Sequence, residues 1–302
     1  MTWQAILFLQ IITAYVVYPV IAKKLTDTTS KIHLQHWMYI FCLFFAFGYL
    51  AWTRDFTYSP AILIIIIIGV INSIGVYCNL RAINISLSKT SVFAMADDII
   101  AMMFGYVFLS ELKFLTPPII IGILLSFSGA TLLYMGKNRI KSSGVKLSSA
   151  DNKKLVRLVM GSRLIWGIAI FFMRYFALSG LSVTEFIVSW YAGAWIGSFI
   201  LFLLFRRKGK KETIKIDNRK ISYIAVFSFL TVLAMFLAFK VLELAPITII
   251  QPIILVSEMI LPLLIGLFIF KEARKLERHE KLAFIIGWTG IAVIAAVYYL
   301  GP

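Results

Sequence analysis

The chain has 302 residues, of which 61% are hydrophobic and 15% charged, and its mean hydropathy is +0.91. This apolar share exceeds that of soluble domains, so the composition excludes an ordinary soluble protein and predicts an integral membrane protein. The formal net charge of +16 at pH 7 would suit a nucleic-acid partner, but basic loops beside a membrane explain it more simply.

Ten apolar stretches follow one another along the chain, each close to the roughly 20 residues that a helix needs to cross a bilayer core. A closed β-barrel would require alternating apolar and polar positions, and the stretches lack this alternation. We therefore predict an all-α integral membrane protein with ten transmembrane helices. The predicted spans are Thr2 to Ala22, His33 to Trp52, Ala61 to Asn79, Lys89 to Leu109, Thr116 to Gly136, Val156 to Ser179, Val183 to Phe205, Ile221 to Leu242, Pro246 to Phe270 and Leu282 to Leu300.

The first span has no basic segment before it and no small-residue cleavage site, so we interpret it as a retained helix rather than a signal peptide. Cys42 and Cys78 both fall inside spans, which argues against a disulfide framework. The histidines His33, His36 and His279 lack metal-ligand spacing, so no metal site is expected. No cofactor is expected either. Because the chain has no GxxxxGK loop for a nucleotide, we do not expect ATP-driven transport by this chain alone.

Lysine and arginine are concentrated in the loops that follow the odd-numbered spans. These loops, counted together with Lys89 and Arg157 at the very start of the spans that follow them, hold 25 of the 30 basic residues, while two lie in the opposite loops and three deeper within spans. Because positively charged loops stay in the cytoplasm, we expect a multi-pass protein of the cell (inner) membrane with both termini outside. Anionic membrane lipid is the expected partner of the basic loops, and no nucleic-acid partner is expected.

The polar segment 137–155 divides the spans five and five, which predicts a first repeat at 1–136 and a second at 156–302, joined by a cytoplasmic linker. Because five is odd, the second half enters the membrane from the opposite side, as in the inverted repeats of secondary transporters. Apolar composition alone would explain one or two matches between the halves. A shift of 161 pairs Asp97 with Glu258, Gly105 with Gly266, Glu111 with Glu272 and Gly129 with Gly290, and a shift of 151 pairs Tyr15 with Trp166 and Lys23 with Arg174.

The two halves end in "GYVFLSELKFLTPPIIIGILLSFSGATLLY" and "GLFIFKEARKLERHEKLAFIIGWTGIAVIAAVYYL". With ten spans and a five-plus-five repeat, the chain resembles the drug/metabolite transporter (DMT) superfamily, specifically its EamA-type ten-helix members. The resemblance covers the whole chain and implies a metabolite carrier or exporter with alternating access and a central cavity. It does not select one substrate, and it departs from the small multidrug relatives because no acid occurs between Met1 and Ala22.

Three acids lie about halfway along predicted spans: Asp97 and Asp98 in the fourth and Glu258 in the ninth. A carboxylate at the centre of a span costs about 2.5 to 3.5 kcal/mol on insertion scales, so these acids require compensation. Neighbouring residues point about 100° apart on a helix. Small neighbours favour Asp98 as the residue facing a cavity, whereas the repeat register favours Asp97, and the sequence does not choose between them.

Three main roles for the acids remain open, beside a metal-binding or other role. They could bind and release protons, or they could hold a cationic amine with the help of aromatic faces. They could also form structural ion pairs with basic residues inside or near the spans. The candidate aromatic residues are Trp37, Trp166, Trp190 and Tyr191, and the candidate ion-pair partners are Arg163, Arg174, Arg81 and Lys240.

Other polar residues are weaker candidates for a substrate site. Gln251 lies seven residues before Glu258 on the same helical face, and Asn72 and Asn79 share one face of the third span. Arg163 could bind a substrate carboxylate, or it could extend to the inner membrane interface. The "GAWIG" motif at Gly193 permits close helix approach, either within the chain or in a dimer.

The leading hypothesis is a secondary-active transporter, exporter or importer, for a small polar metabolite that is amino-acid-like or cationic, and not an enzyme. Coupling to protons, the direction of transport and the choice between monomer and homodimer stay open. A membrane enzyme with paired carboxylates would show protease-type flanking motifs at both aspartates, which are missing. A non-transporting scaffold would need fully self-paired polar groups around a dry core.

Overall fold

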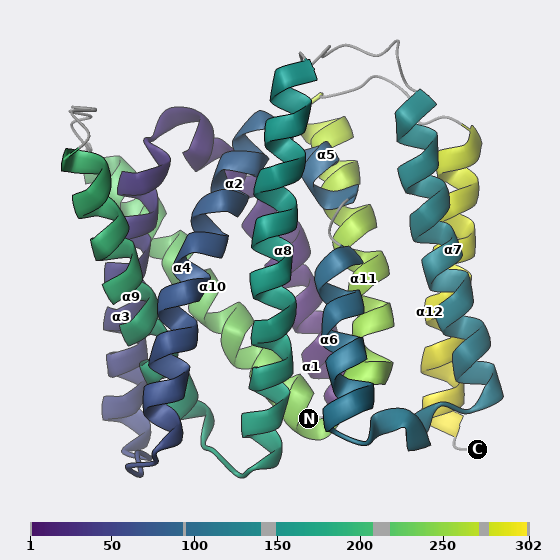
Figure 1. The fold of residues 1–302 in the computed structure, drawn as a ribbon, viewed down its shortest axis with the longest axis horizontal. Helices are drawn as coiled ribbons and strands as arrows, with labels where there is room; N and C mark the ends of the chain where they lie inside the picture. Colours follow the sequence, from purple (N-terminus) through teal and green to yellow (C-terminus); the bar gives the residue numbers. More distant parts are fainter. Residues whose placement is uncertain (1, 93–94, 140–148, 208–217, 272–277, 301–302) are drawn as a thin grey trace. The chain divides into compact units, whose positions relative to one another are not determined.

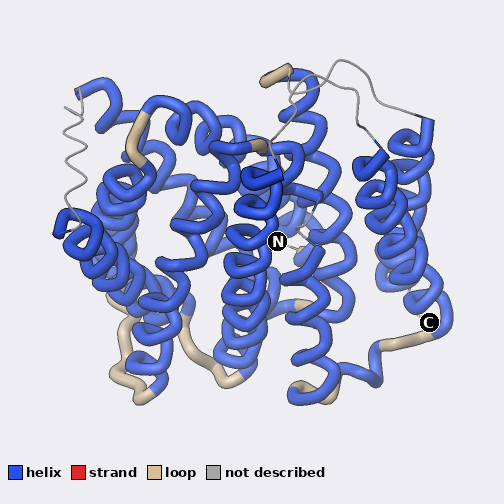
Figure 2. Tube along the Cα trace, turned by 45° about the horizontal axis from the view of Figure 1, so that its top comes forward, coloured by secondary structure: helices blue, strands red, loops and turns tan. Residues whose placement is uncertain are grey.

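The structure is a computed structural model and describes residues 2–92, 95–139, 149–207, 218–271 and 278–300. Within these residues the regular structure is entirely helical (Figure 2). The α-helices are α1 (Trp3–Ile11), α2 (Tyr18–Thr28), α3 (Lys31–Thr53), α4 (Ala61–Ile85), α5 (Leu87–Val92), α6 (Met95–Phe108), α7 (Pro117–Arg139), α8 (Ser149–Leu178), α9 (Val183–Arg207), α10 (Asn218–Leu244), α11 (Ile247–Leu264) and α12 (Arg278–Leu300). Two π-helical segments, η1 (Ile12–Val17) and η3 (Ile265–Ile269), and one 3-10 helix, η2 (Glu111–Phe114), complete them.

Among the described residues, seven helical stretches are long and apolar enough to cross a membrane: Trp3–Thr28, Lys31–Thr53, Ala61–Ile85, Lys153–Leu178, Val183–Arg206, Lys220–Leu244 and Ile247–Ile269. The predicted all-helical fold is therefore confirmed for the described residues, and these stretches are consistent with a multi-pass membrane protein. Shorter apolar helices, Pro117–Gly129 and Lys281–Ile294, lie where the fifth and tenth spans are predicted. The fourth predicted span falls on α5 and α6, and residues 93–94 between them lie outside the described part of the chain.

The chain forms two compact units, and each contains segments from both halves of the sequence. The first unit comprises Met1–Asn84 and Phe172–Glu243, and the second comprises Ile85–Phe171 and Leu244–Pro302. Helix α8 thus contributes its first part to the second unit and its last turns to the first unit. This division into units does not test the predicted inverted repeat, which stays a prediction.

In the first unit, glycines allow α4 and α9 to pack with their backbones close together. A Cβ at Gly193 would collide with the backbone of Ile66, and a Cβ at Gly197 would lie 2.6 Å from the carbonyl oxygen of Val70. Gly69 on α4 meets the backbone of α9 in the same way. The "GAWIG" motif therefore serves packing within the chain, one of the two roles that the sequence predicts for it.

The second unit is built around α11, which is buried along almost its whole surface. All its residues except Leu261 and Leu264 are buried, and it contacts α5, α6, α7 and α12. Helices α7 and α12 lie side by side (Figure 1) and pack through small residues such as Gly129 and Gly287. Pro252 and Pro262 both lie inside the continuous α11, which runs on into η3. A polar side chain on α11 is consequently enclosed by neighbouring helices.

Candidate functional site

Four ionisable residues meet inside the second unit, and we call them the charged cluster: Asp97, Asp98, Arg163 and Glu258. The aspartates lie in the first turn of α6, the arginine on α8 and the glutamate on α11. Both aspartates are fully buried, and Arg163 and Glu258 are 7% and 8% exposed. Three helices that are distant in sequence therefore bring charges together out of contact with bulk solvent.

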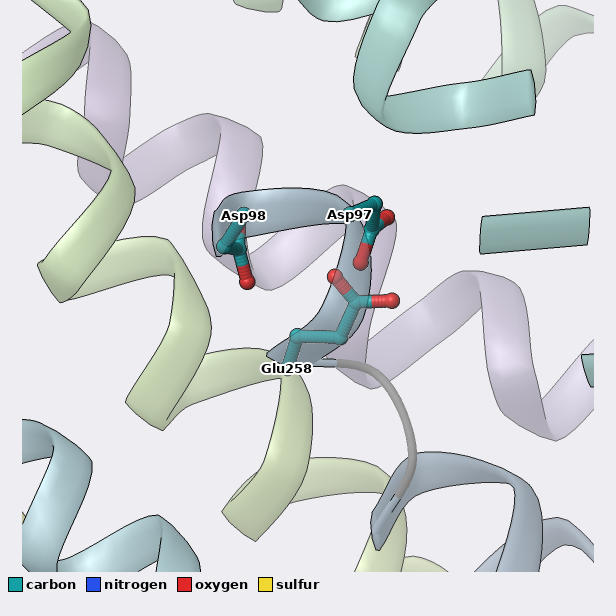
Figure 3. Close-up of side chains that lie close together, drawn as sticks. All are labelled: Asp97, Asp98 and Glu258. Carbon is teal, nitrogen blue, oxygen red and sulfur yellow. The ribbon is translucent and has the colours of Figure 1, made fainter. Parts of the chain in front are cut away.

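One guanidinium joins two of the acids. Arg163 Nη1 donates to Asp97 Oδ2 at 3.1 Å and also to Glu258 Oε1. Figure 3 shows the carboxylates of Asp97 and Glu258 pointing toward one another, with Asp98 beside them on the same helix as Asp97. The predicted ion pairs with Arg163 are thus present for Asp97 and Glu258, while the role of the acids stays a prediction. The alternative position of Arg163, extended to the membrane interface, is wrong because its head group binds buried acids.

Asp98 also reaches the cluster, although neighbouring side chains were expected to diverge. One carboxylate oxygen from each of Asp97, Asp98 and Glu258 lies within 4.8 Å of the others. Glu258 extends toward both aspartates from α11 (Figure 3). This spacing would suit a shared proton or a bound cation.

The cluster carries unused hydrogen-bonding capacity. Asp97 Oδ1 and both oxygens of Asp98 have no hydrogen-bond partner among the described residues, and neither does Arg163 Nε. Three carboxylates face one guanidinium, so the cluster has a net charge of −2 when all its members are ionised. Buried charges without partners are strongly unfavourable. The cluster therefore favours taking up positive charge.

Gly167 lets α8 approach α6 next to the cluster. A Cβ at this position would lie 2.7 Å from the carbonyl oxygen of Asp97 and 2.8 Å from Cβ of Ile100. Gly167 follows Arg163 by four residues, which places both on one face of α8. Sequence reasoning missed this role, although the spacing of an arginine and a glycine by one turn was a usable signal.

Glu111 holds the start of α11. Its carboxylate, 1% exposed, accepts the backbone N–H groups of Ile247 at 3.3 Å and Thr248 at 3.1 Å. The first N–H groups of a helix have no partner within the helix, and an acid there also complements the helix dipole. Pro246 at the N-cap has no side-chain hydrogen bond to offer. Sequence reasoning used Glu111 only as a repeat match, and its counterpart Glu272 lies outside the described residues.

Two further predicted site residues belong to the second unit. Gln251 lies two turns before Glu258 on α11, is 1% exposed, and has no partner for its Oε1 among the described residues. Trp166 lies half-buried on α8, three residues after Arg163. Gln251 and Trp166 therefore stay candidates for substrate binding beside the charged cluster.

The remaining predicted residues belong to the first unit. Asn72 is buried on α4, Asn79 is half-buried on the same helix, and Trp37 is half-buried on α3. Trp190 and Tyr191 are both 1% exposed on α9, where the tyrosine hydroxyl donates to the carbonyl oxygen of Thr231 at 3.0 Å. Their predicted part in substrate binding stays a prediction.

The other basic residues proposed as partners for the acids make different contacts. Arg174 donates to the carbonyl oxygen of Leu242. Lys240 pairs with Glu243 at 2.7 Å, and the guanidinium of Arg81 lies 5.6 Å from the centre of the Tyr77 ring.

No protein-family model matches the sequence, and a search of curated proteins finds no match. Among solved structures, a crystal structure of a protein has a similar fold, with a TM-score of 0.70, 12% sequence identity and 98% of each chain covered. At this identity the likeness concerns the fold alone. It extends over nearly the whole chain.

Proposed function

We propose that this protein is a secondary-active transporter that moves a small polar metabolite across the cell (inner) membrane by alternating access, coupled to protons. The observation that carries the proposal is the composition of the charged cluster, in which three buried carboxylates face one guanidinium. In this proposal the chain is a carrier and not an enzyme.

Ionisable residues within membrane spans are rare and mark substrate pathways or proton relays. A cluster that served packing alone would be expected to pair its polar atoms, as buried groups in proteins do. Arg163 can balance one of the three acids, and both oxygens of Asp98 lack a partner among the described residues. Protons or a bound cation would supply the remaining positive charge, and exchange of that charge would couple transport to a gradient.

The unused groups also favour a class of substrate. Asp98 offers acceptors for an ammonium group, and Arg163 Nε offers a donor for a carboxylate. An amino acid carries both complementary groups, and a small amine carries one of them. The proposed substrate is therefore an amino-acid-like or cationic metabolite.

The wider framework of the proposal is the EamA-type architecture of the DMT superfamily. Its support is the matched position of Asp97 and Glu258 in the two halves and the basic loops on one side. In that framework the two halves are inverted repeats, the basic loops face the cytoplasm, and both termini lie outside.

The proposal is tested in liposomes that contain the purified protein and an internal pH-sensitive dye. A panel of the common amino acids and small amines is added outside, and proton movement is followed. We expect at least one compound to drive proton movement through the wild-type protein, and Asp98→Asn to reduce the rate at least about tenfold, the effect of losing about 1.4 kcal/mol of stabilisation.

Asp55→Asn is the matched control, because Asp55 is an exposed aspartate outside the helices. It should leave the rate unchanged. Proton-coupled transport by Asp98→Asn at the wild-type rate would overturn the coupling role. The absence of any coupled movement across the panel, with correctly folded protein, would favour a non-transporting scaffold.

A further inference from the structure

A lysine ties the end of α2 to the end of α4 in the first unit. Lys23 Nζ donates to the carbonyl oxygens of Ile83 at 3.2 Å and Asn84 at 3.0 Å. The amide of Asn84 in turn donates to the carbonyl oxygen of Thr26 at 3.1 Å and to Asp27 Oδ1 at 2.9 Å. We call the bonds from Lys23 to the end of α4 the Lys23 contact.

An arginine ties α8 to the end of α10 in the same unit. Arg174 is 6% exposed and its Nη1 donates to the carbonyl oxygen of Leu242. We call this bond the Arg174 contact. In both contacts a buried cation binds the last carbonyl groups of another helix, which have no partner within that helix and carry its partial negative charge.

The two contacts occupy corresponding places in the two halves of the sequence. Lys23 and Arg174 are 151 positions apart (174 − 23), the same shift that pairs Tyr15 with Trp166. Their acceptors, Ile83 and Leu242, each lie two residues before the last residue of α4 or α10. In each half a cation therefore binds the end of a later helix: Lys23 on α2 binds the end of α4, and Arg174 on α8 binds the end of α10.

The predicted topology assigns the two contacts to opposite membrane faces. The first and third spans end beside basic loops, which are expected in the cytoplasm, whereas the sixth and eighth end on the other side. The Lys23 contact would then lie at the inner face and the Arg174 contact at the outer face.

We propose that Lys23 and Arg174 are equivalent positioning residues that close opposite membrane faces of the transporter, each by joining the first and third helices of its half. This inference rests on the proposed function. Without the cation, the freed carbonyl groups must be hydrated, because buried polar groups without partners are unfavourable. Water reaches them only when the helix ends separate, so loss of either contact opens its own face.

Side-specific labelling tests the inference. A reporter cysteine replaces Asn72, which is buried near the middle of α4, in a background with Cys42→Ser and Cys78→Ser. A membrane-impermeant maleimide is applied to spheroplasts and, separately, to inside-out vesicles. We expect Lys23→Met to raise labelling from the inside, and Arg174→Met to raise it from the outside, each by at least about tenfold, because a single charged hydrogen bond is worth about that factor. Lys23→Met removes two such bonds and also the ion pair of Lys23 with Asp27 at 3.5 Å.

Conservative and matched variants separate this role from general stability. Lys23→Arg and Arg174→Lys should keep the wild-type ratio of inside to outside labelling. Lys24→Met and Arg157→Met, which remove exposed cations from α2 and α8, should also keep it. An equal rise from both sides in both Met variants, or no change in either, would overturn the inference.

Hydrogen exchange gives a second measurement if a Met variant is produced poorly with the reporter. Lys23→Met should speed exchange in the last turn of α4 alone, and Arg174→Met in the last turn of α10 alone. Faster exchange at both ends in each variant would contradict the inference. Labelling and exchange need no substrate or proton gradient, so they can be measured independently of transport. Intact transport with unchanged labelling in both Met variants would overturn this inference alone. Absent transport, together with the expected rise from the inside in Lys23→Met and from the outside in Arg174→Met, would overturn the proposed function alone.

Discussion

Single residues determine the electrostatic balance of the charged cluster. Arg163 forms ion pairs with both Asp97 and Glu258 through the same nitrogen, Nη1. Asp98 lies beside them, and neither of its carboxylate oxygens has a hydrogen-bond partner among the described residues. The guanidinium side chain is only 8% exposed, so water does not replace it readily when it is removed. The stability of the cluster therefore depends on this one cation.

We predict that Arg163→Gln destabilises the protein strongly. Breaking a buried ion pair by removing one partner costs about 3 to 5 kcal/mol, because the other charge stays buried. Unfolding of the purified protein in detergent, followed by denaturant titration, would measure the loss in the free energy of unfolding.

Two further variants check the cause of that loss. Arg157→Gln, an exposed arginine on the same helix, should change stability little. Adding Glu258→Gln to Arg163→Gln should recover part of the loss, since one unpaired acid is then removed. Equal stability of Arg163→Gln and the wild-type protein would show that the ion pairs contribute nothing.

At the scale of helices, the cluster depends on how closely three elements approach. Glu111 holds the first turn of α11, which carries Glu258, by accepting two backbone N–H groups. Helix α8 can bring Arg163 close to α6 because Gly167 has no side chain that would collide with the backbone of Asp97 and the side chain of Ile100. The hydrogen bonds of Glu111 and the close contact at Gly167 both involve backbone atoms, so they influence the position of whole helices.

We predict that Gly167→Ala destabilises the protein although alanine favours helix. Its Cβ would lie 2.7 Å from the carbonyl oxygen of Asp97, and overpacking of this kind costs about 1 to 3 kcal/mol. The same denaturant titration measures the change, and transport in liposomes reports whether the cluster is displaced.

Gly161 on the same helix is the matched control. A Cβ there meets nothing within 4 Å, so Gly161→Ala should be neutral or stabilise by about 0.5 to 1 kcal/mol through backbone entropy. If the two alanine variants behaved alike, close approach of α8 and α6 would not be important for stability.

At the scale of the whole molecule, the chain consists of two compact units that each draw on both halves of the sequence. In the part of the chain that the structure describes, seven stretches are long and apolar enough to cross a membrane. The charged cluster belongs entirely to the second unit, and the Lys23 and Arg174 contacts belong entirely to the first. The orientation of these helices in the membrane is a prediction from the basic loops.

We predict that alkaline phosphatase fused after Pro302 is active and that the same enzyme inserted in the linker 137–155 is inactive. The enzyme is active only outside the cytoplasm, and positive loops keep the linker inside. Activity of both fusions in intact cells checks the orientation. The reverse pattern would place the C-terminus in the cytoplasm and would exchange the faces assigned to Lys23 and Arg174.

Much of the fold follows from local sequence. A bilayer requires long apolar helices whose backbone groups are paired internally, so runs such as 61–79 predict a helix without reference to any partner, and α4 confirms it. Precise bounds are less predictable, because polar residues extend helices beyond the membrane. Helix α8 begins at Ser149 rather than at the predicted Val156.

The sequence by itself determined that the protein is helical and that several helices are long and apolar enough to cross a membrane. It also singled out Asp97, Asp98 and Glu258, although the structure places both aspartates in the first turn of α6 rather than halfway along a helix. Only the tertiary structure decided that Arg163, and not the other basic candidates, joins these acids. The paired residues are 66 and 95 positions apart, and apolar periodicity shows which face of a helix is buried but not which helix covers it. The pairing depends on close backbone approach at Gly167, which exists only once the helices are packed.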